Sequence, residues 1–106
     1  MKSCPLGPRF MSLALAKRAE KVAAARGVSK VARSPRGFMA AWKRGEIDDY
    51  WCRRRAAFLK RHVAQAAQSG EVMWKNGQPT RRHLALVMWA WTPTPGRLAA
   101  WLRKGA

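Results

Sequence analysis

The sequence is poor in acidic residues, in β-branched residues and in cysteine. Five Asp and Glu stand against 22 Lys and Arg in 106 residues, which gives a formal net charge of +17. Val, Ile and Thr together supply only ten residues whereas Ala is abundant, and this composition favours helices over a sheet. Two cysteines, Cys4 and Cys52, exclude a disulfide framework. One bridge is possible, but two reduced thiols in a cytosolic protein are the more economical interpretation.

Long apolar runs are also missing. The longest one covers residues 84–91, far short of the roughly 20 residues that a membrane-spanning helix needs. The first ten residues contain Lys2 and Arg9 but are interrupted by Pro5, Gly7 and Pro8, so they lack the continuous apolar stretch of a secretory signal. These features predict a cytoplasmic protein.

The chain is nevertheless rich in the residues that build a core. It is 48% hydrophobic and contains six Trp, whereas disordered basic tails are poor in aromatic residues. Its length fits one domain with a small core. We therefore expect an irregular N-terminal arm over residues 1–9 and a single helical domain over residues 10–106. The expected fold class is all-α, a compact bundle of four to five short helices with a basic N-terminal segment.

Helix-start and helix-stop residues divide the domain. A first helix is expected from residue 10 or 12 to residue 26, with inward Leu15, Ala19, Val22 and Ala23, followed by a connector or one extra turn at 28–33. Ser34 and Pro35 predict the start of a short helix that ends at Gly45. The longest helix is expected from residue 48 or 49 to residue 68, with an apolar stripe at Cys52, Ala56, Leu59, Val63 and Ala66.

The C-terminal third begins with a weaker signal. Val72 to Trp74 could form a strand, and Asn76-Gly77 is typical of tight turns. Because Pro79 and Thr80 follow at once, we expect a loop here. Thr80 then predicts a central, deeply buried helix to about residue 91, and Thr94 with Pro95 predicts a last helix.

The positive charge is unevenly distributed. Residues 1–44 carry a net charge of +10, residues 45–74 carry +1 and residues 75–106 carry +6. Because charge of one sign destabilises a compact monomer, we expect a polyanionic partner, and nucleic acid is the commonest. A membrane-surface function is disfavoured, because short capped helices are better explained by packing on one another.

The most informative cations stand at the predicted start of the helix after Pro79. Arg81, Arg82 and His83 follow the cap residue Thr80, where cations are unfavourable unless an anion lies among them. A phosphate would resolve the conflict. The alternative is that the arginines are solvated or form ion pairs with Asp48, Asp49 or Glu71.

Other basic residues form broader candidate contacts. Arg54 and Arg61 share one helix face, and Trp74 beside Lys75 could stack on a base. Residues 27–33 weakly match a helix-turn-helix, although Ser34-Pro35 would end the second helix at once. The N-terminal half adds cations suited to sequence-independent phosphate contacts, namely Lys17, Arg18, Lys21, Lys30, Arg33 and Arg36.

The sequence offers little for catalysis or metal binding. Cys4, Cys52, His62 and His83 have no zinc-module spacing, and no carboxylate pair or nucleophile–base set is evident. We expect no metal, no cofactor and no enzymatic activity.

Residues 53–62 (RRRAAFLKRH) and 77–91 (GQPTRRHLALVMWAW) together resemble a family of small basic bacterial and phage proteins of unknown function. The family pattern runs Arg-Arg-x-x-Phe-Leu-x-Arg-His, then Gly-x-Pro-Thr-Arg, then an Ala- and Leu-rich run ending in Ala-Trp. The second arginine and the histidine after Arg81, and the long N-terminal half, depart from it. The resemblance implies a bacterial or phage context, marks Arg61, His62, Thr80 and Arg81, and implies no catalytic residue.

Taken together, the sequence predicts a non-enzymatic nucleic-acid-binding protein that contacts mainly phosphates, with duplex DNA preferred over RNA. The alternative is a phage or bacterial interaction factor that docks on an acidic host protein or a nucleoprotein complex through an exposed Trp/Met patch rimmed by Arg. The oligomeric state stays open.

Overall fold

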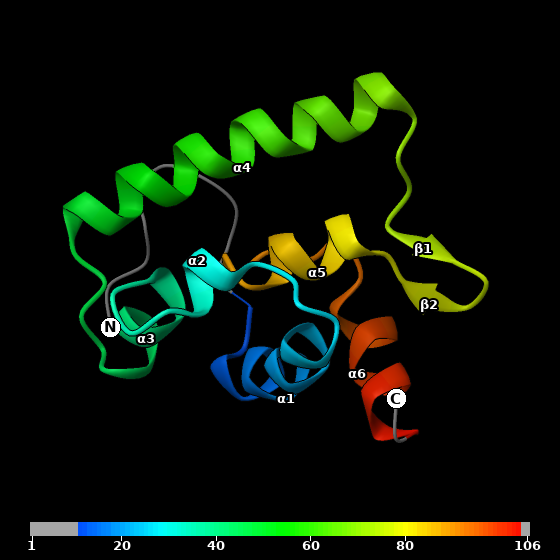
Figure 1. The fold of residues 1–106 in the computed structure, drawn as a ribbon, viewed down its shortest axis with the longest axis horizontal. Helices are drawn as coiled ribbons and strands as arrows, with labels where there is room; N and C mark the ends of the chain where they lie inside the picture. Colours follow the sequence, from blue (N-terminus) through cyan, green and yellow to red (C-terminus); the bar gives the residue numbers. More distant parts are fainter. Residues whose placement is uncertain (1–10, 105–106) are drawn as a thin grey trace.

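The computed structural model describes residues 11–104 (Figure 1). The arm expected over residues 1–9 and Cys4 lie outside this range. In chain order the elements are α1 (Leu13–Ala25), α2 (Lys30–Arg33), α3 (Phe38–Lys43), α4 (Asp49–Ser69), β1 (Trp74–Lys75), β2 (Gln78–Pro79), α5 (Arg81–Val87) and α6 (Pro95–Arg103). The all-α fold class is confirmed, with one small hairpin added.

The helices pack around α5. Figure 1 shows α4 along the top of the molecule, with α5 beneath it and α1 beneath α5. Helix α5 contacts both α1 and α4, and α6 contacts α1. Leu84, Leu86 and Val87 of α5 are fully buried, so the predicted central position of this helix is confirmed. Long helix α4 therefore has one side on the core and one side in solvent.

The face that α1 turns toward the core consists of alanines. Ala16, Ala19 and Ala23 are fully buried, whereas Leu15 and Val22 pack only at the edge of the core. Small side chains let neighbouring helices approach closely. Phe38, Met39 and Trp42 of α3 add large, buried side chains to the same core.

The two longest helices begin and end as predicted. The Ser12 side chain accepts a hydrogen bond from the Leu15 amide at the start of α1, and the Asp48 side chain accepts one from the Trp51 amide at the start of α4. Gly27 follows α1 with φ +65°, and Gly70 follows α4 with φ +72°. Because caps and stop residues act within one turn, they can be read directly from sequence.

The predicted start of the third helix is wrong. Ser34 does not cap it. Its hydroxyl donates to the Val31 carbonyl, 2.8 Å away, and closes α2, while α3 begins after Gly37. A Cβ on Gly37 would lie 2.3 Å from the Val31 carbonyl oxygen. The helix start is thus set by a close backbone approach that only glycine permits.

The loop expected around Asn76-Gly77 is a two-residue hairpin. Asn76 and Gly77 have φ of +53° and +73°, the positive values that such turns require. Trp74 pairs with Pro79, and Lys75 pairs with Gln78. The Thr80 amide donates to the Met73 carbonyl at 3.0 Å, so Pro79 stands at the intervening position where the ladder needs no amide. Pro79 is therefore compatible with a strand at this position, and the prediction of a loop was wrong.

The fourth predicted helix is too long. Helix α5 ends at Val87 instead of about residue 91, and Ala90 adopts φ +63°.

The expectation of reduced thiols is wrong for Cys52, which is disulfide-bonded. Among residues 11–104, no helix combines the length and apolar character needed to cross a membrane.

Candidate nucleic-acid interface

The solvent side of α4 carries a stripe of cations. Arg53, Arg54, Lys60 and Arg61 are all exposed, and we call these four residues the α4 basic face. At 100° per residue they fall within about a third of the helix circumference. The opposite side, with Cys52, Leu59 and Ala66, is buried. Asp49 in the first turn of α4 stands four residues before Arg53 on the same face. Residues 50–69 include no Asp or Glu, so the stripe contains no acid beyond that first turn.

Arg54 is held by aromatic neighbours. Its Nη1 donates to the Tyr50 hydroxyl at 3.0 Å, and its guanidinium carbon lies 5.4 Å from the centre of the Trp51 ring. A guanidinium over an aromatic face is stabilised by the ring quadrupole while it remains able to contact an anion. Arg54 is thus an oriented cation at the edge of the α4 basic face.

Arg82 forms the ion pair that the sequence left open as an alternative. Its Nε donates to Glu71 Oε2 at 2.8 Å, and its Nη2 donates to Glu71 Oε1 at 3.0 Å. The hydrogen bond to Arg82 lowers the pKa of Glu71, and the same bond raises the pKa of Arg82. The charge of Arg82 is therefore matched within the chain.

Arg81 joins two elements. Its Nη1 donates to the Arg26 carbonyl at 2.7 Å, at the C-terminal end of α1 where the helix dipole favours a cation. Arg26 in turn donates to the Pro79 carbonyl at 3.1 Å and to the Gln78 side chain at 2.9 Å. These contacts explain the arginine at the start of α5 without a bound anion.

His83 is a core residue, so its predicted contact with nucleic acid is wrong. The ring is fully buried and lies 3.0 Å from the Met73 carbonyl through Nδ1 and 2.7 Å from the Thr92 hydroxyl through Nε2. These partners suit a neutral ring that donates from Nδ1. Burial is the main cause that lowers the pKa of His83.

The hydroxyl of the predicted cap residue Thr80 makes hydrogen bonds within the chain. Its hydroxyl donates to the Val72 carbonyl at 2.8 Å and accepts from the His83 amide at 3.2 Å. Thr80 therefore connects the hairpin to α5 as well as capping the helix.

A shallow pocket of about 350 Å³ forms beside the Arg82 ion pair. It is lined by His62, Glu71, Arg81 and Arg82, among others. Arg82 Nη1 lies 2.7 Å from His62 Nδ1, and burial, followed by the charges of Arg82 and Arg61, lowers the pKa of His62. A phosphate here would have to displace the Glu71 carboxylate, so the pocket is a weaker anion site than the α4 basic face.

The predicted cations of the N-terminal half are mostly available to solvent. Arg33 is the exception, because its Nε donates to the Val28 carbonyl at 2.7 Å and the residue is half-buried. Helix α2 has only four residues, too few for the recognition helix of a helix-turn-helix motif. The exposed members are Lys17, Arg18 and Lys21 on α1, Lys30 on α2, and Arg36 before α3.

Trp74 is less open than a base-stacking residue needs to be. Its Nε1 donates to the Thr94 hydroxyl at 2.9 Å, its ring meets His83 edge-on, and the Arg97 guanidinium covers it at 4.2 Å. Neighbouring Lys75 is exposed. Stacking of a base on Trp74 would require Arg97 to move away.

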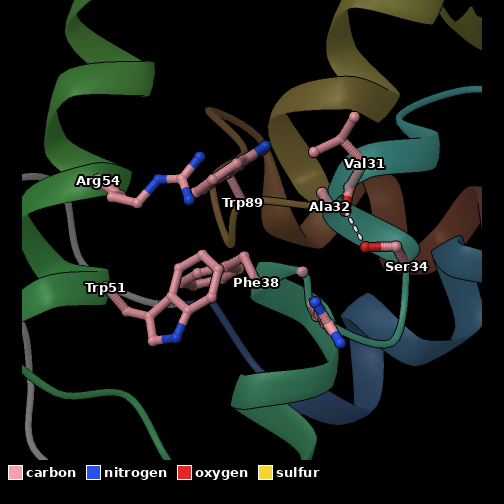
Figure 2. A pocket seen from close by; sticks show the side chains of 9 residues that line it. Val31, Ala32, Ser34, Phe38, Trp51, Arg54 and Trp89 are labelled. Atoms are coloured by element: carbon pink, nitrogen blue, oxygen red, sulfur yellow. Dashed lines mark hydrogen bonds between the residues drawn. The ribbon is translucent and has the colours of Figure 1, made fainter.

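Sequence reasoning missed two features. Arg55 is fully buried and donates to the Trp89 and Ala90 carbonyls, each at 2.7 Å. Its position three residues after Cys52 and four before Leu59 on the apolar stripe was the available signal. The second feature is an aromatic pocket between α2, α3 and α4 (Figure 2). No sequence signal marks it, because its lining residues come from three separate stretches of the chain, around residues 31–38, 51–54 and 89.

No group of three or more His, Cys, Asp or Glu side chains in residues 11–104 is arranged to hold a metal ion. Comparison with protein-family models, with curated proteins and with solved structures finds no significant match. The resemblance of residues 53–62 and 77–91 to small basic bacterial and phage proteins therefore stays a prediction.

Proposed function

We propose that this chain binds nucleic acid through the phosphate backbone, with duplex DNA preferred over RNA, as a non-enzymatic protein of bacterial or phage origin. The observation that carries the proposal is the α4 basic face, an exposed stripe of four cations on the longest helix, which has no acid after Asp49 in its first turn. Phosphates supply the counter-charge that the chain itself lacks.

The acids of the chain are committed elsewhere. Glu20 pairs with Lys43, Glu46 with Arg44 and Glu71 with Arg82, and Asp48 caps α4. Asp49 lies in the first turn of α4, where it complements the helix dipole. This distribution supports an external polyanion as the partner of the α4 basic face.

The shape of α4 suits a duplex. Its 21 residues extend over about 31 Å, and the major groove of DNA, about 12 Å wide, admits one helix. Exposed Ala57 and Ala64 lie between the cations and allow the helix backbone a close approach. Lys17, Arg18 and Lys21 lie on α1, on the other side of α5 from α4 (Figure 1). They would raise the affinity through longer-range attraction to phosphates rather than through contacts beside the α4 basic face.

A salt titration tests the proposal. Affinity for duplex DNA, single-stranded DNA and structured RNA is measured between 50 and 300 mM NaCl. If about six phosphates are neutralised, the logarithm of the binding constant should fall with the logarithm of the salt concentration at a slope near −5. A flat salt response would contradict the proposal.

A matched pair of variants locates the interface. Lys60→Gln/Arg61→Gln removes two charges from the α4 basic face and should make the slope shallower by about 1.8 on duplex DNA. Arg103→Gln/Lys104→Gln removes the same two residue types from exposed positions at the end of α6 and should leave the slope nearly unchanged. Equal effects of the two variants would show that net charge, not α4, determines binding.

A further inference from the structure

An aromatic pocket opens where α4 passes the turn between α2 and α3. It has a volume of about 180 Å³, and its lining includes Arg36, Phe38, Trp51, Arg54 and Trp89. Figure 2 shows Arg54 and Trp51 reaching from α4 toward Trp89 and Phe38, with the α2 residues Val31 and Ala32 on the opposite side. Aromatic side chains thus lie on the α4 side of the pocket, and the aliphatic side chains of α2 lie on the other side.

The aromatic rings that line this pocket pack against one another. Phe38 stacks on Trp89 with ring centres 5.1 Å apart, and Trp51 meets Phe38 edge-on at 6.0 Å. Phe38 and Trp89 are buried in the core, whereas Trp51 is half-buried. Trp89 also stacks on Phe58 with ring centres 4.5 Å apart, and the Arg54 guanidinium lies over Trp51. A planar ring that enters would therefore contact the face of Trp51 once Arg54 turns from that ring toward an adjoining phosphate.

The charged side chains around the pocket are of one sign. Arg36 and Arg54 are both exposed and both line it, and among residues 11–104 no Asp or Glu does. Arg54 also belongs to the α4 basic face, so this face continues without interruption into the pocket. A polyanion lying on α4 would have a phosphate at the edge of an aromatic cavity.

We infer that this pocket receives a single unpaired nucleobase, with the adjoining phosphates on Arg54 and Arg36. The inference rests on the proposed nucleic-acid binding and adds the feature that the chain would prefer. The cavity is smaller than the roughly 300 Å³ of pockets that take drug-sized ligands, so it suits one ring system and excludes a base pair. Extrusion of a base costs least when the base is already unpaired.

Three DNA duplexes of identical length test the inference on the wild-type protein. One is fully paired, one carries a single bulged adenine, and one carries the same bulge without its base. Base–aromatic contacts of about 1–3 kcal/mol predict that the adenine bulge binds at least fivefold more tightly than the other two, at fixed salt. The abasic bulge has the same backbone and flexibility, so it separates base recognition from DNA bending.

Variants place this preference in the pocket. Trp51→Leu should abolish the difference between the adenine and abasic bulges, whereas Trp101→Leu, at another half-buried Trp with an arginine over its ring, should retain it. Arg54→Ala should weaken binding of the bulged duplex more than Arg103→Ala does. The two arginine variants change exposed side chains and so test the pocket even if Trp51→Leu fails to fold.

The outcomes separate this inference from the proposed function. Equal affinity for the adenine and abasic bulges, or a preference that survives both Trp51→Leu and Arg54→Ala, overturns the inference and leaves phosphate binding intact. If no duplex binds, both the inference and the proposed function fail.

A synthetic Asp-rich peptide with one Leu tests the alternative that the pocket binds an acidic protein. If it binds in a Trp51-dependent manner while the three duplexes bind alike, the pocket takes an acidic protein partner and the inference is wrong.

Discussion

At the scale of single residues, three consecutive arginines of α4 have three different roles. Arg53 faces solvent, Arg54 lies over the ring of Trp51, and Arg55 is fully buried. Successive positions differ by about 100° around the helix, which is sufficient to carry a side chain from water into the core. Burial lowers the pKa of Arg55 to about 10, so the guanidinium is still charged at neutral pH when it donates to the Trp89 and Ala90 carbonyls.

Replacement of Arg55 should destabilise the fold without affecting the α4 basic face. Arg55→Met retains much of the volume but leaves the Trp89 and Ala90 carbonyls without their donor, and we expect a loss of about 3 kcal/mol in the free energy of unfolding. Arg53→Met should change it by less than about 0.5 kcal/mol, because Arg53 is exposed. Urea unfolding measures both, and equal midpoints would contradict a structural role for Arg55.

At the scale of elements, local signals were reliable where one turn of chain decides the conformation. The caps at Ser12 and Asp48 and the glycines after α1 and α4 mark boundaries that the structure confirms. The signals failed where a distant segment decides. Ser34 resembles a cap, but Gly37 lies against the carbonyls of Val31 and Ala32, and α5 ends early where the carbonyls of Trp89 and Ala90 meet Arg55.

The hairpin allows a comparison of two glycines. Gly77→Ala should destabilise the protein by about 1 kcal/mol, because Gly77 has φ +73°, a conformation that costs an L-residue free energy. Gly96→Ala should stabilise it by about 0.5 kcal/mol, because Gly96 lies in the first turn of α6 and a Cβ there meets nothing within 4 Å. Thermal unfolding of both variants measures the two signs. A stabilising Gly77→Ala would show that the turn does not require positive φ.

For the site, sequence reasoning predicted phosphate binding, and the structure changes which of the predicted residues are available for it. Exposed Arg54 and Arg61 were predicted as a shared face, and they belong to the α4 basic face. Arg81, Arg82 and His83 were chosen because cations oppose a helix dipole. They are instead accounted for by the Arg26 carbonyl, by Glu71 and by burial in the core. The hydrogen-bond partners of these three residues are 9 to 55 positions away, beyond the reach of any local pattern.

At the scale of the whole molecule, the charge opposes the fold. A net charge of +17 is carried by a chain with a radius of gyration of 13.0 Å, a size typical of neutral domains of this length. Many like charges are therefore separated by about one Debye length at 0.1 M salt. Their repulsion lowers the stability of the free protein.

Salt should therefore stabilise the free protein while it weakens nucleic-acid binding. Between 20 and 200 mM NaCl we expect the melting temperature to rise by about 5 °C, equivalent to about 1 kcal/mol. In Lys60→Gln/Arg61→Gln the rise should be smaller, because two of the repelling charges are absent. Differential scanning fluorimetry measures both, and a melting temperature that falls with salt would show that ion pairs within the chain outweigh the repulsion.

The sequence by itself determined the helical class, the ends of α1 and α4, and the excess of positive charge, because composition and capping act over a few residues. Only the tertiary structure decided which cations remain available to an anion. Arg55 is buried, Arg82 is paired with Glu71 and Arg81 is bound to the end of α1, whereas the α4 basic face stays exposed. The tertiary packing also formed the aromatic pocket beside Arg54. Both results depend on which distant segments pack together, and packing is a property of the folded chain as a whole.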